Sequence, residues 1–299
     1  MNATTPSPIT MTVPILLVIF AGFVLAGMDA QAKILAALGA PVLMIIWGRY
    51  FFHTLVTFVV YAGVKRSFAF MKPRRPWLQF FRASALFGAT TFFYTAITRM
   101  PLGDAASIQF LAPVLVTAFS GLFLGEKVGP RRWAAVVCAF VGVIIVARPG
   151  SGVFGLWALM PLATAFLLAT YMIMTRTIRD KDSADVTTFY TTAVGAVVLS
   201  AIMPTVWEPL SGDAWVLMVG MGVAGAVGHY CFVRAFHAAE ASALAPFTYA
   251  HVVAAIIYGL VIFKDPPSVW TLSGAALIVG SGIYVWYRET MIARAARRP

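Results

Sequence analysis

Charged side chains are scarce in this sequence. Asp, Glu, Lys and Arg make up 11% of the 299 residues, whereas hydrophobic residues make up 61%, and the mean hydropathy is +0.86. A water-soluble domain of this length needs far more charge to cover its surface. The composition therefore excludes a soluble globular protein and indicates that lipid surrounds much of the folded chain.

Cysteine and the motifs of membrane enzymes are also rare or missing. The two cysteines, Cys138 and Cys231, lie in apolar runs, which excludes a disulfide framework and favours ordinary packing. No HExxH metal motif or GxSG turn occurs, and Gly103-Asp104 lacks the preceding glycine of an intramembrane aspartyl protease. We therefore expect no catalytic residues, no metal and no cofactor.

Long apolar runs recur along the chain, and short links separate them. A helix needs roughly 20 apolar residues to cross a hydrocarbon core of about 30 Å. The runs predict an all-α integral membrane protein with ten transmembrane helices. The predicted spans are 11–34, 41–63, 77–98, 104–124, 130–147, 155–177, 186–204, 213–236, 241–263 and 268–287.

The basic residues predict the orientation of these spans. There are 22 Lys and Arg against 11 Asp and Glu; with a cytoplasmic N-terminus, sixteen of the 22 fall inside and four outside. This bias follows the positive-inside rule and predicts a bacterial-type inner-membrane protein with both termini in the cytoplasm. The basic clusters are short and form no continuous face, so we expect no nucleic-acid partner. The expected partners are lipid and a small-molecule substrate, with the chain acting as a monomer.

The two halves of the chain resemble each other at an offset of about 138 residues. The matching pairs are Ala105 and Ala243, Ala112 and Ala250, Val114 and Val252, Gly121 and Gly259, and Gly142 and Gly280. Five helices per half is an odd number, so the second half enters the membrane in the opposite sense. The predicted fold is therefore two inverted five-helix repeats, an arrangement that places a substrate site near the midplane between the halves.

Several segments of the first half resemble the EamA module of the drug/metabolite transporter superfamily. These are Tyr94-Thr-Ala-Ile97, Ala105-Ala-Ser107, Leu111-Ala-Pro113, Leu122-Phe-Leu-Gly-Glu-Lys127 and Val141-Gly-Val-Ile-Ile-Val146. The resemblance implies two EamA-like repeats, over residues 11–147 and 155–287, that carry small metabolites by alternating access. The second repeat departs from the pattern at His251, which stands where the first has Pro113.

The aromatic-rich interior is similar to that of the aromatic amino-acid exporters in this superfamily. The expected activity is therefore export of small metabolites, with aromatic or neutral amino acids as the substrates. An uptake carrier, or an exporter of drugs or other metabolites, fits the same resemblance. A channel and a membrane enzyme are the alternatives from other classes, although no charged ring or filter-like segment appears.

Polar residues inside the spans are expected to have a structural or functional role, because a charge in the middle of a membrane helix is costly. Asp29 and Arg49 are expected at similar depth, where they could form a structural ion pair, a gate or an anchor for a substrate carboxylate. His53 lies one turn from Arg49 on the same face and could join either arrangement. Asp29 is the one acid clearly inside a span, so proton antiport and facilitated transport both remain open.

Further polar and aromatic residues are candidates for the lining of a substrate cavity. Membrane tyrosines more often serve packing or interfacial anchoring, whereas a buried histidine usually has a polar partner or faces water. The cavity candidates are Tyr94, Gln109, His229, Tyr230, Tyr249, His251, Trp157 and Tyr171.

One glycine-rich segment imitates a nucleotide-binding motif. Residues 220–225 spell GxGxxG, which binds dinucleotides only between a strand and a helix. Here the segment lies inside a predicted span, where small residues let helices approach closely. We interpret these glycines as packing residues.

Overall fold

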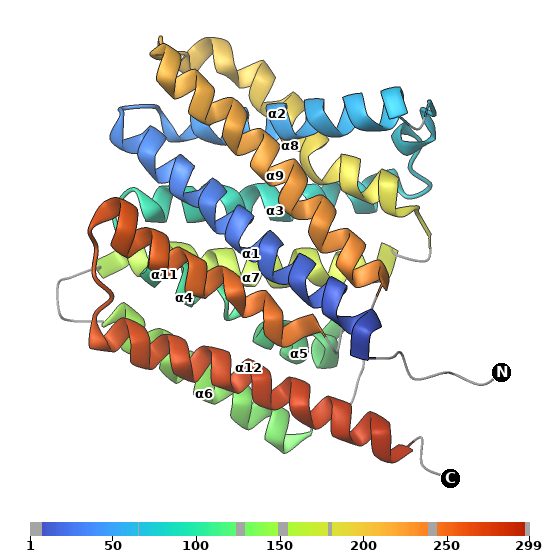
Figure 1. The fold of residues 1–299 in the computed structure, drawn as a ribbon, viewed down its shortest axis with the longest axis vertical. Coiled ribbons are helices and arrows are strands. Elements are labelled where there is room, and N and C mark those ends of the chain that lie inside the picture. The colour runs from blue at the N-terminus through green and yellow to red at the C-terminus, as the bar shows by residue number, and fades with distance from the viewer. Residues whose placement is uncertain are drawn as a thin grey trace.

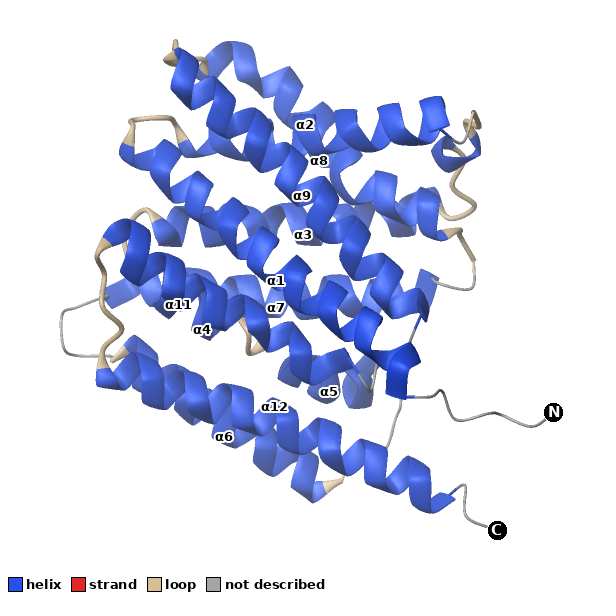
Figure 2. Ribbon diagram, viewed as in Figure 1, coloured by secondary structure: helices blue, strands red, loops and turns tan. Residues whose placement is uncertain are grey.

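The part of the chain that the computed structural model describes is mainly helical. The described residues are 8–64, 66–123, 129–148, 155–178, 181–238 and 244–296, and no strand occurs among them (Figure 2). Seven of these helices are long and apolar enough to cross a membrane, and shorter apolar helices cover Leu102–Val116 and Trp133–Ala147. The chain is an all-α, multi-span membrane protein, which confirms the fold class inferred from composition.

The first half consists of five segments that run back and forth (Figure 1). In order they are α1 (Pro8–Ala37), α2 (Val42–Val59) continued by the π-helix η1 (Val60–Val64), α3 (Pro76–Ile97), the pair α4 (Leu102–Gln109) and α5 (Ala112–Phe123), and α6 (Pro130–Ala147). A short 3₁₀ turn, η2 (Ala69–Met71), links α2 to α3.

The second half repeats this order. It comprises η3 (Gly155–Ala158) with α7 (Leu159–Ile178), α8 (Ala184–Val206), α9 (Gly212–Ala238), the pair η4 (Ala245–Tyr249) and α11 (Ala250–Phe263), and α12 (Val269–Ala296).

The fourth segment of neither half is one continuous α-helix, whereas the sequence predicted single spans over 104–124 and 241–263; residues 241–243 lie outside the described residues. In the first half the helix stops at Gln109 and resumes at Ala112. Pro113 explains this break, because a proline has no N–H to donate to the carbonyl four residues earlier. In the second half a 3₁₀ helix, with Pro246 in its first turn, precedes α11.

Equivalent helices of the two halves make equivalent packing contacts. Helix α1 packs on α9 as α7 packs on α3, and α1 packs on α11 as α7 packs on α4 and α5. Helix α2 packs on α9 as α8 packs on α3, while α2 with α8 and α6 with α12 are pairs between equivalent helices. Consecutive segments alternate in direction, so the halves thread in opposite senses (Figure 1). The fold is two inverted five-helix repeats.

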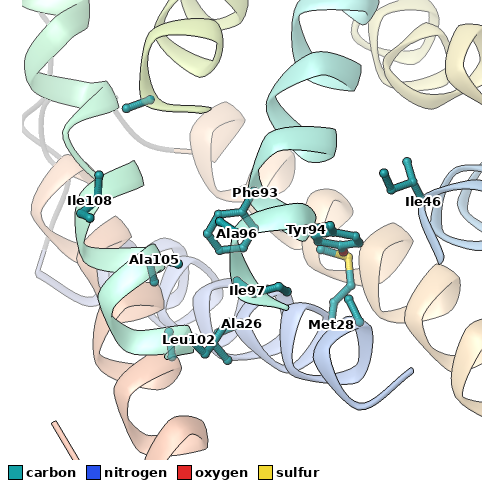
Figure 3. Close-up of a cluster of buried hydrophobic side chains, with 14 of the residues drawn as sticks. Ala26, Met28, Ile46, Phe93, Tyr94, Ala96, Ile97, Leu102, Ala105 and Ile108 are labelled. Atoms are coloured by element: carbon teal, nitrogen blue, oxygen red, sulfur yellow. The ribbon is translucent and has the colours of Figure 1, made fainter. Parts of the chain in front are cut away.

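These contacts arrange most of the helices as a ring around the centre of the molecule. The order around the ring is α1, α9, α2, α8, α3, α7, the α4–α5 pair and the η4–α11 pair, which returns to α1. Helices α6 and α12 pack against each other outside this ring (Figure 1). Inside the ring, small and aliphatic side chains of α1 to α4 are almost fully buried, and Met28 extends toward the ring of Tyr94 (Figure 3).

Helix α1 begins and α12 ends at the same end of the bundle, on the right of Figure 1. We call this the terminus end and the other the opposite end. Arg75, which precedes α3, and Arg131, in the first turn of α6, also lie at the terminus end. The basic links thus share an end with the termini, and their cytoplasmic location stays a prediction.

The glycines of α9 allow close packing inside the ring. A Cβ atom on Gly222 would lie 2.2 Å from the Cβ of Phe52 on α2, and one on Gly228 would lie 2.8 Å from the side chain of Leu25 on α1. These distances are shorter than real carbon contacts. The GxGxxG segment is therefore a packing surface, as its apolar setting suggested.

Candidate functional site

Arg49 on α2 is a buried cation in the middle of the ring. Its guanidinium carbon lies 5.2 Å from the ring centroid of Tyr94 and 5.8 Å from that of Tyr50. Its Nη1 donates a hydrogen bond of 3.4 Å to the hydroxyl oxygen of Thr90, which also pairs with the Tyr50 hydroxyl at 3.0 Å. Aromatic faces attract a desolvated cation. The Nε atom has no partner among the described residues and remains a free donor.

Tyr94 on α3 connects the two halves beside this cation. Its side chain is almost completely buried, and its hydroxyl lies 3.9 Å from the sulfur of Met221 on α9. Helix α3 belongs to the first half and α9 to the second. The aromatic face that meets Arg49 therefore lies at the boundary between the repeats.

Two histidines extend the site from α2 to α9. The rings of His53 and His229 have centroids 5.2 Å apart. The Nδ1 atom of His229 lies 2.9 Å from the carbonyl oxygen of Gly225, whereas Nδ1 of the buried His53 has no partner within the described part of the chain. A Cβ on Gly225 would approach His53 to 3.1 Å, so a glycine suits this position.

Asp29 on α1 meets His251 on α11. The carboxylate Oδ2 and the imidazole Nε2 are 3.2 Å apart, and the His251 ring lies against Phe110 with centroids 5.2 Å apart. Phe110 sits at the break between α4 and α5. This pair, like the contact of Tyr94 with Met221, joins the first half to the second.

The sequence had paired Asp29 with Arg49 as one interpretation, and the structure gives both residues other partners. The interpretation assumed that α1 and α2, as consecutive helices, pack side by side. Instead α9 lies between them, and α1 packs on α9 and α11. The carboxylate consequently meets an imidazole, and the guanidinium meets tyrosine rings.

The remaining cavity candidates lie in different places. Tyr249 is buried against Phe110 with ring centroids 5.7 Å apart, and Gln109 is buried in the last turn of α4. Tyr230 is 55% exposed. Trp157, 39% exposed, lies beneath Arg99 near the opposite end.

Tyr171 contacts a second buried cation, Arg82, nearer the terminus end. The Arg82 side chain is fully buried, 5.1 Å from the Tyr171 ring centroid, and donates to the carbonyl oxygen of Thr187 at 2.6 Å. It also donates to Gln79, whose amide donates to Asp182 at 2.9 Å. This network ties α3 to the start of α8.

A further set of polar contacts lies at the opposite end of the bundle. Lys33 on α1 forms an ion pair of 3.2 Å with Asp265, which follows α11. Nearby, the Thr271 hydroxyl donates to the carboxylate of Asp104, beside a cavity of about 180 Å³. Polar contacts therefore lie toward both ends of the ring, and Asp29, Arg49 and His53 at its centre are buried.

We use the term central cluster for the polar residues that meet inside the ring. Its members are Asp29, Arg49, Tyr50, His53, Thr90, Tyr94, His229 and His251. Tyr50 and Thr90 were not among the candidates, although Thr90 lies one turn before Tyr94 on the same helix. Within the described residues no group of three potential ligands could hold a metal ion.

A cation against aromatic faces and a carboxylate beside an imidazole could bind the ionised groups and ring of a small molecule. The model of the EamA-like transporter family matches residues 4–148 and 155–287.

The relatives include proteins named for transport in both directions. The chain is 28% identical over 214 residues to a riboflavin transporter of Vibrio cholerae, covering 71% of this chain and 72% of that protein. It is 28% identical to an S-adenosylmethionine uptake transporter of Rickettsia felis, over 81% of each chain. It is 26% identical to a pseudopaline exporter of Pseudomonas aeruginosa, over 89% of this chain and 93% of the exporter.

A solved crystal structure shares the fold with a TM-score of 0.61 and 20% sequence identity, over 94% of this chain and 99% of that chain. The family model covers nearly the whole sequence, in two segments that together contain every helix of the central cluster. The chain belongs to the EamA-like transporter family and is a membrane transporter rather than an enzyme.

Proposed function

We propose that this transporter exports small metabolites that carry a planar aromatic ring and a carboxylate, with aromatic amino acids as the first substrates to test. The observation that carries the proposal is Arg49, a buried cation between the rings of Tyr50 and Tyr94. Arg49 Nε is a free donor toward a carboxylate, and the tyrosine rings offer faces for an aromatic group.

The names of the relatives support a planar substrate. Riboflavin and S-adenosylmethionine, which appear in two of those names, both contain planar nitrogen heterocycles. Aromatic faces beside one fixed cation suit such rings as well as the ring of tryptophan. Substrates of this kind differ in their polar groups, which makes the polar members of the central cluster the natural basis of selectivity.

Alternating access follows from the inverted repeats. Arg49 and Tyr94 belong to the first repeat, whereas His229 and His251 belong to the second. When one repeat rocks against the other, a site built from both can open first to one end of the bundle and then to the other. The boundaries of the repeats, 11–147 and 155–287, form part of this proposal.

Counterflow in liposomes tests the proposal. Purified protein in vesicles loaded with unlabelled tryptophan should take up labelled tryptophan saturably, and phenylalanine and tyrosine should compete. Arg49→Gln should lower the initial rate at least about ten-fold, because a hydrogen bond to a charged group contributes roughly 1.5–3 kcal/mol. Arg99→Gln is the matched control, since Arg99 lies over Trp157 outside the central cluster, and its rate should equal that of the wild type.

Other outcomes point to other functions. Movement of riboflavin without any movement of aromatic amino acids would reject the substrate class while retaining the carrier. Flux that does not saturate would indicate a pore.

Uptake is the second candidate, because one group of relatives is named for uptake. Cells that express the protein and are loaded with labelled tryptophan should lose the label faster than cells that express Arg49→Gln. Faster accumulation from the medium would assign uptake instead.

A further inference from the structure

We propose that Asp29 and His251 form the proton site that couples transport to a proton gradient, with one proton moving against each substrate molecule. This inference rests on the proposed function, because it concerns the energy source of the same carrier. The observation behind it is the 3.2 Å contact between the Asp29 carboxylate and the His251 imidazole.

The pair joins the two repeats. Asp29 lies on α1 of the first repeat and His251 on α11 of the second, and these helices pack closely. A Cβ on Gly22 of α1 would lie 2.9 Å from the backbone nitrogen of His251, so the two backbones are nearly in contact. A change in charge between Asp29 and His251 would therefore act directly on the interface that must move.

The other buried acids have no such partner. The Asp104 carboxylate, near the opposite end, accepts a hydrogen bond from the neutral Thr271 hydroxyl. The Asp182 carboxylate, near the terminus end, accepts from the Gln79 amide and the Arg74 backbone. Of the buried acids in the described part of the chain, Asp29 is the one whose carboxylate meets a titratable ring.

The charged and titratable groups around the pair come from several helices. Arg49 on α2 and Tyr94 on α3 lie within electrostatic range of Asp29, and His229 on α9 does as well. The His53 ring packs against the His229 ring. On the second repeat, the hydroxyl of Tyr258 donates to the carbonyl oxygen of Phe23. Tyr249, the residue before α11, packs against Phe110, which also lies against His251.

In this setting the substrate and a proton on His251 compete to neutralise the Asp29 carboxylate. Histidine is the side chain whose charge ordinarily changes near neutral pH. A protonated imidazole neutralises the Asp29 carboxylate. This pairing is favourable because an unpaired charge inside the membrane is costly. The ammonium group of an amino acid can neutralise the same carboxylate, and the substrate carboxylate can then bind Arg49.

One transport cycle exchanges one proton for one substrate molecule. When substrate binds from one side, its ammonium group takes the place of the imidazolium, and His251 releases one proton to water on that side. After the repeats rock and the substrate leaves, His251 takes up one proton from the other side. Each cycle therefore moves one substrate molecule and one proton in opposite directions.

A titration of His251 tests the pair without any substrate. The chain has four histidines, so protein with isotope-labelled histidine gives few imidazole signals by NMR, and His251→Gln identifies one of them by its loss. That signal should move with pH, and Asp29→Asn should change the movement. A His251 signal that stays constant as the pH is varied would overturn the inference.

Proton-driven accumulation tests the coupling itself. Vesicles with an interior one pH unit more acidic than the medium should concentrate labelled tryptophan up to about ten-fold, because one pH unit corresponds to about 1.36 kcal/mol. Asp29→Asn and His251→Gln should reduce the ratio to one. Asp213→Asn is the matched control, since it removes an exposed carboxylate in the first turn of α9, outside the central cluster, and it should accumulate tryptophan as the wild type does.

Counterflow at equal pH separates the two proposals. Normal wild-type counterflow without accumulation in the gradient would overturn proton coupling and leave the carrier intact. Absence of counterflow for tryptophan, phenylalanine and tyrosine would reject the proposed function and this inference with it.

Discussion

At the scale of single residues, the polar side chains of the ring are placed by contacts between distant helices. The histidine beside Arg49 could be predicted, because His53 follows four residues later on the same helical face. The partner of Asp29 could not, because it depends on which helices are neighbours in the ring. His251 lies more than two hundred residues further along the chain, and no local pattern links the two.

Arg82 gives a prediction at this scale. Its donors satisfy Gln79, the Thr187 carbonyl and the Thr191 hydroxyl inside the protein. Arg82→Met should remove these hydrogen bonds and leave the buried Gln79 amide oxygen without its donor, whereas the Thr187 carbonyl still accepts from the Thr191 hydroxyl. The free energy of unfolding should fall by at least about 1 kcal/mol, since a buried unsatisfied group costs roughly 1–3 kcal/mol. Thermal unfolding in detergent measures the loss.

Two further variants make the measurement specific. Arg82→Lys should restore little stability, because an ammonium group cannot reproduce the planar fork of the guanidinium. Arg99→Met removes a cation that is exposed and lies over Trp157, and it should shift the midpoint much less. Equal midpoints for Arg82→Met and the wild type would mean that the network contributes nothing to stability.

At the scale of helices, the spans followed from the apolar runs, whereas the breaks within them did not. Hydrophobicity continues through Phe110 and Leu111, so it cannot report where the helix stops. Pro113 was visible in the sequence, but prolines are also tolerated inside membrane helices, as Pro204 is in α8. The break matters because it presents Phe110 to the rings of Tyr249 and His251.

The pair of α6 and α12 gives a prediction at this scale. A Cβ on Gly142 would lie 2.9 Å from the carbonyl oxygen of Gly274, and one on Gly274 would lie 2.6 Å from the carbonyl oxygen of Gly142. Gly142→Ala should therefore push the helices apart and lower the thermal midpoint, because overpacking costs typically 1–3 kcal/mol. Gly280→Ala on α12 is the control, since its Cβ would meet nothing within 4 Å.

The control should behave in the opposite way. Alanine favours helix over glycine by about 1 kcal/mol, so Gly280→Ala should leave the midpoint unchanged or raise it. If Gly142→Ala also raises the midpoint, α6 and α12 do not depend on backbone contact at this position.

At the scale of the whole molecule, the alternation of apolar runs and basic links predicted the architecture well. An odd number of helices per half predicts inversion, and the structure shows α1 beginning and α12 ending at one end. The order of helices around the ring could not be predicted, because apolar surfaces of membrane helices are chemically alike and packing details select their neighbours. This order decides which residues enter the central cluster.

The central claim is that two inverted repeats rock around a shared site. Helices α3 and α9 are equivalent in the two repeats and lie apart in the ring, with α2 and α8 between them. Spin labels at Trp77 and Arg234 report their separation at the terminus end, and labels at Arg99 and Asp213 report it at the opposite end; all four positions are exposed. Pulsed electron resonance in nanodiscs gives both distances with and without tryptophan. We expect tryptophan to lengthen one distance while it shortens the other. Two distances that change together, or that stay fixed while transport proceeds, would contradict a rocking mechanism.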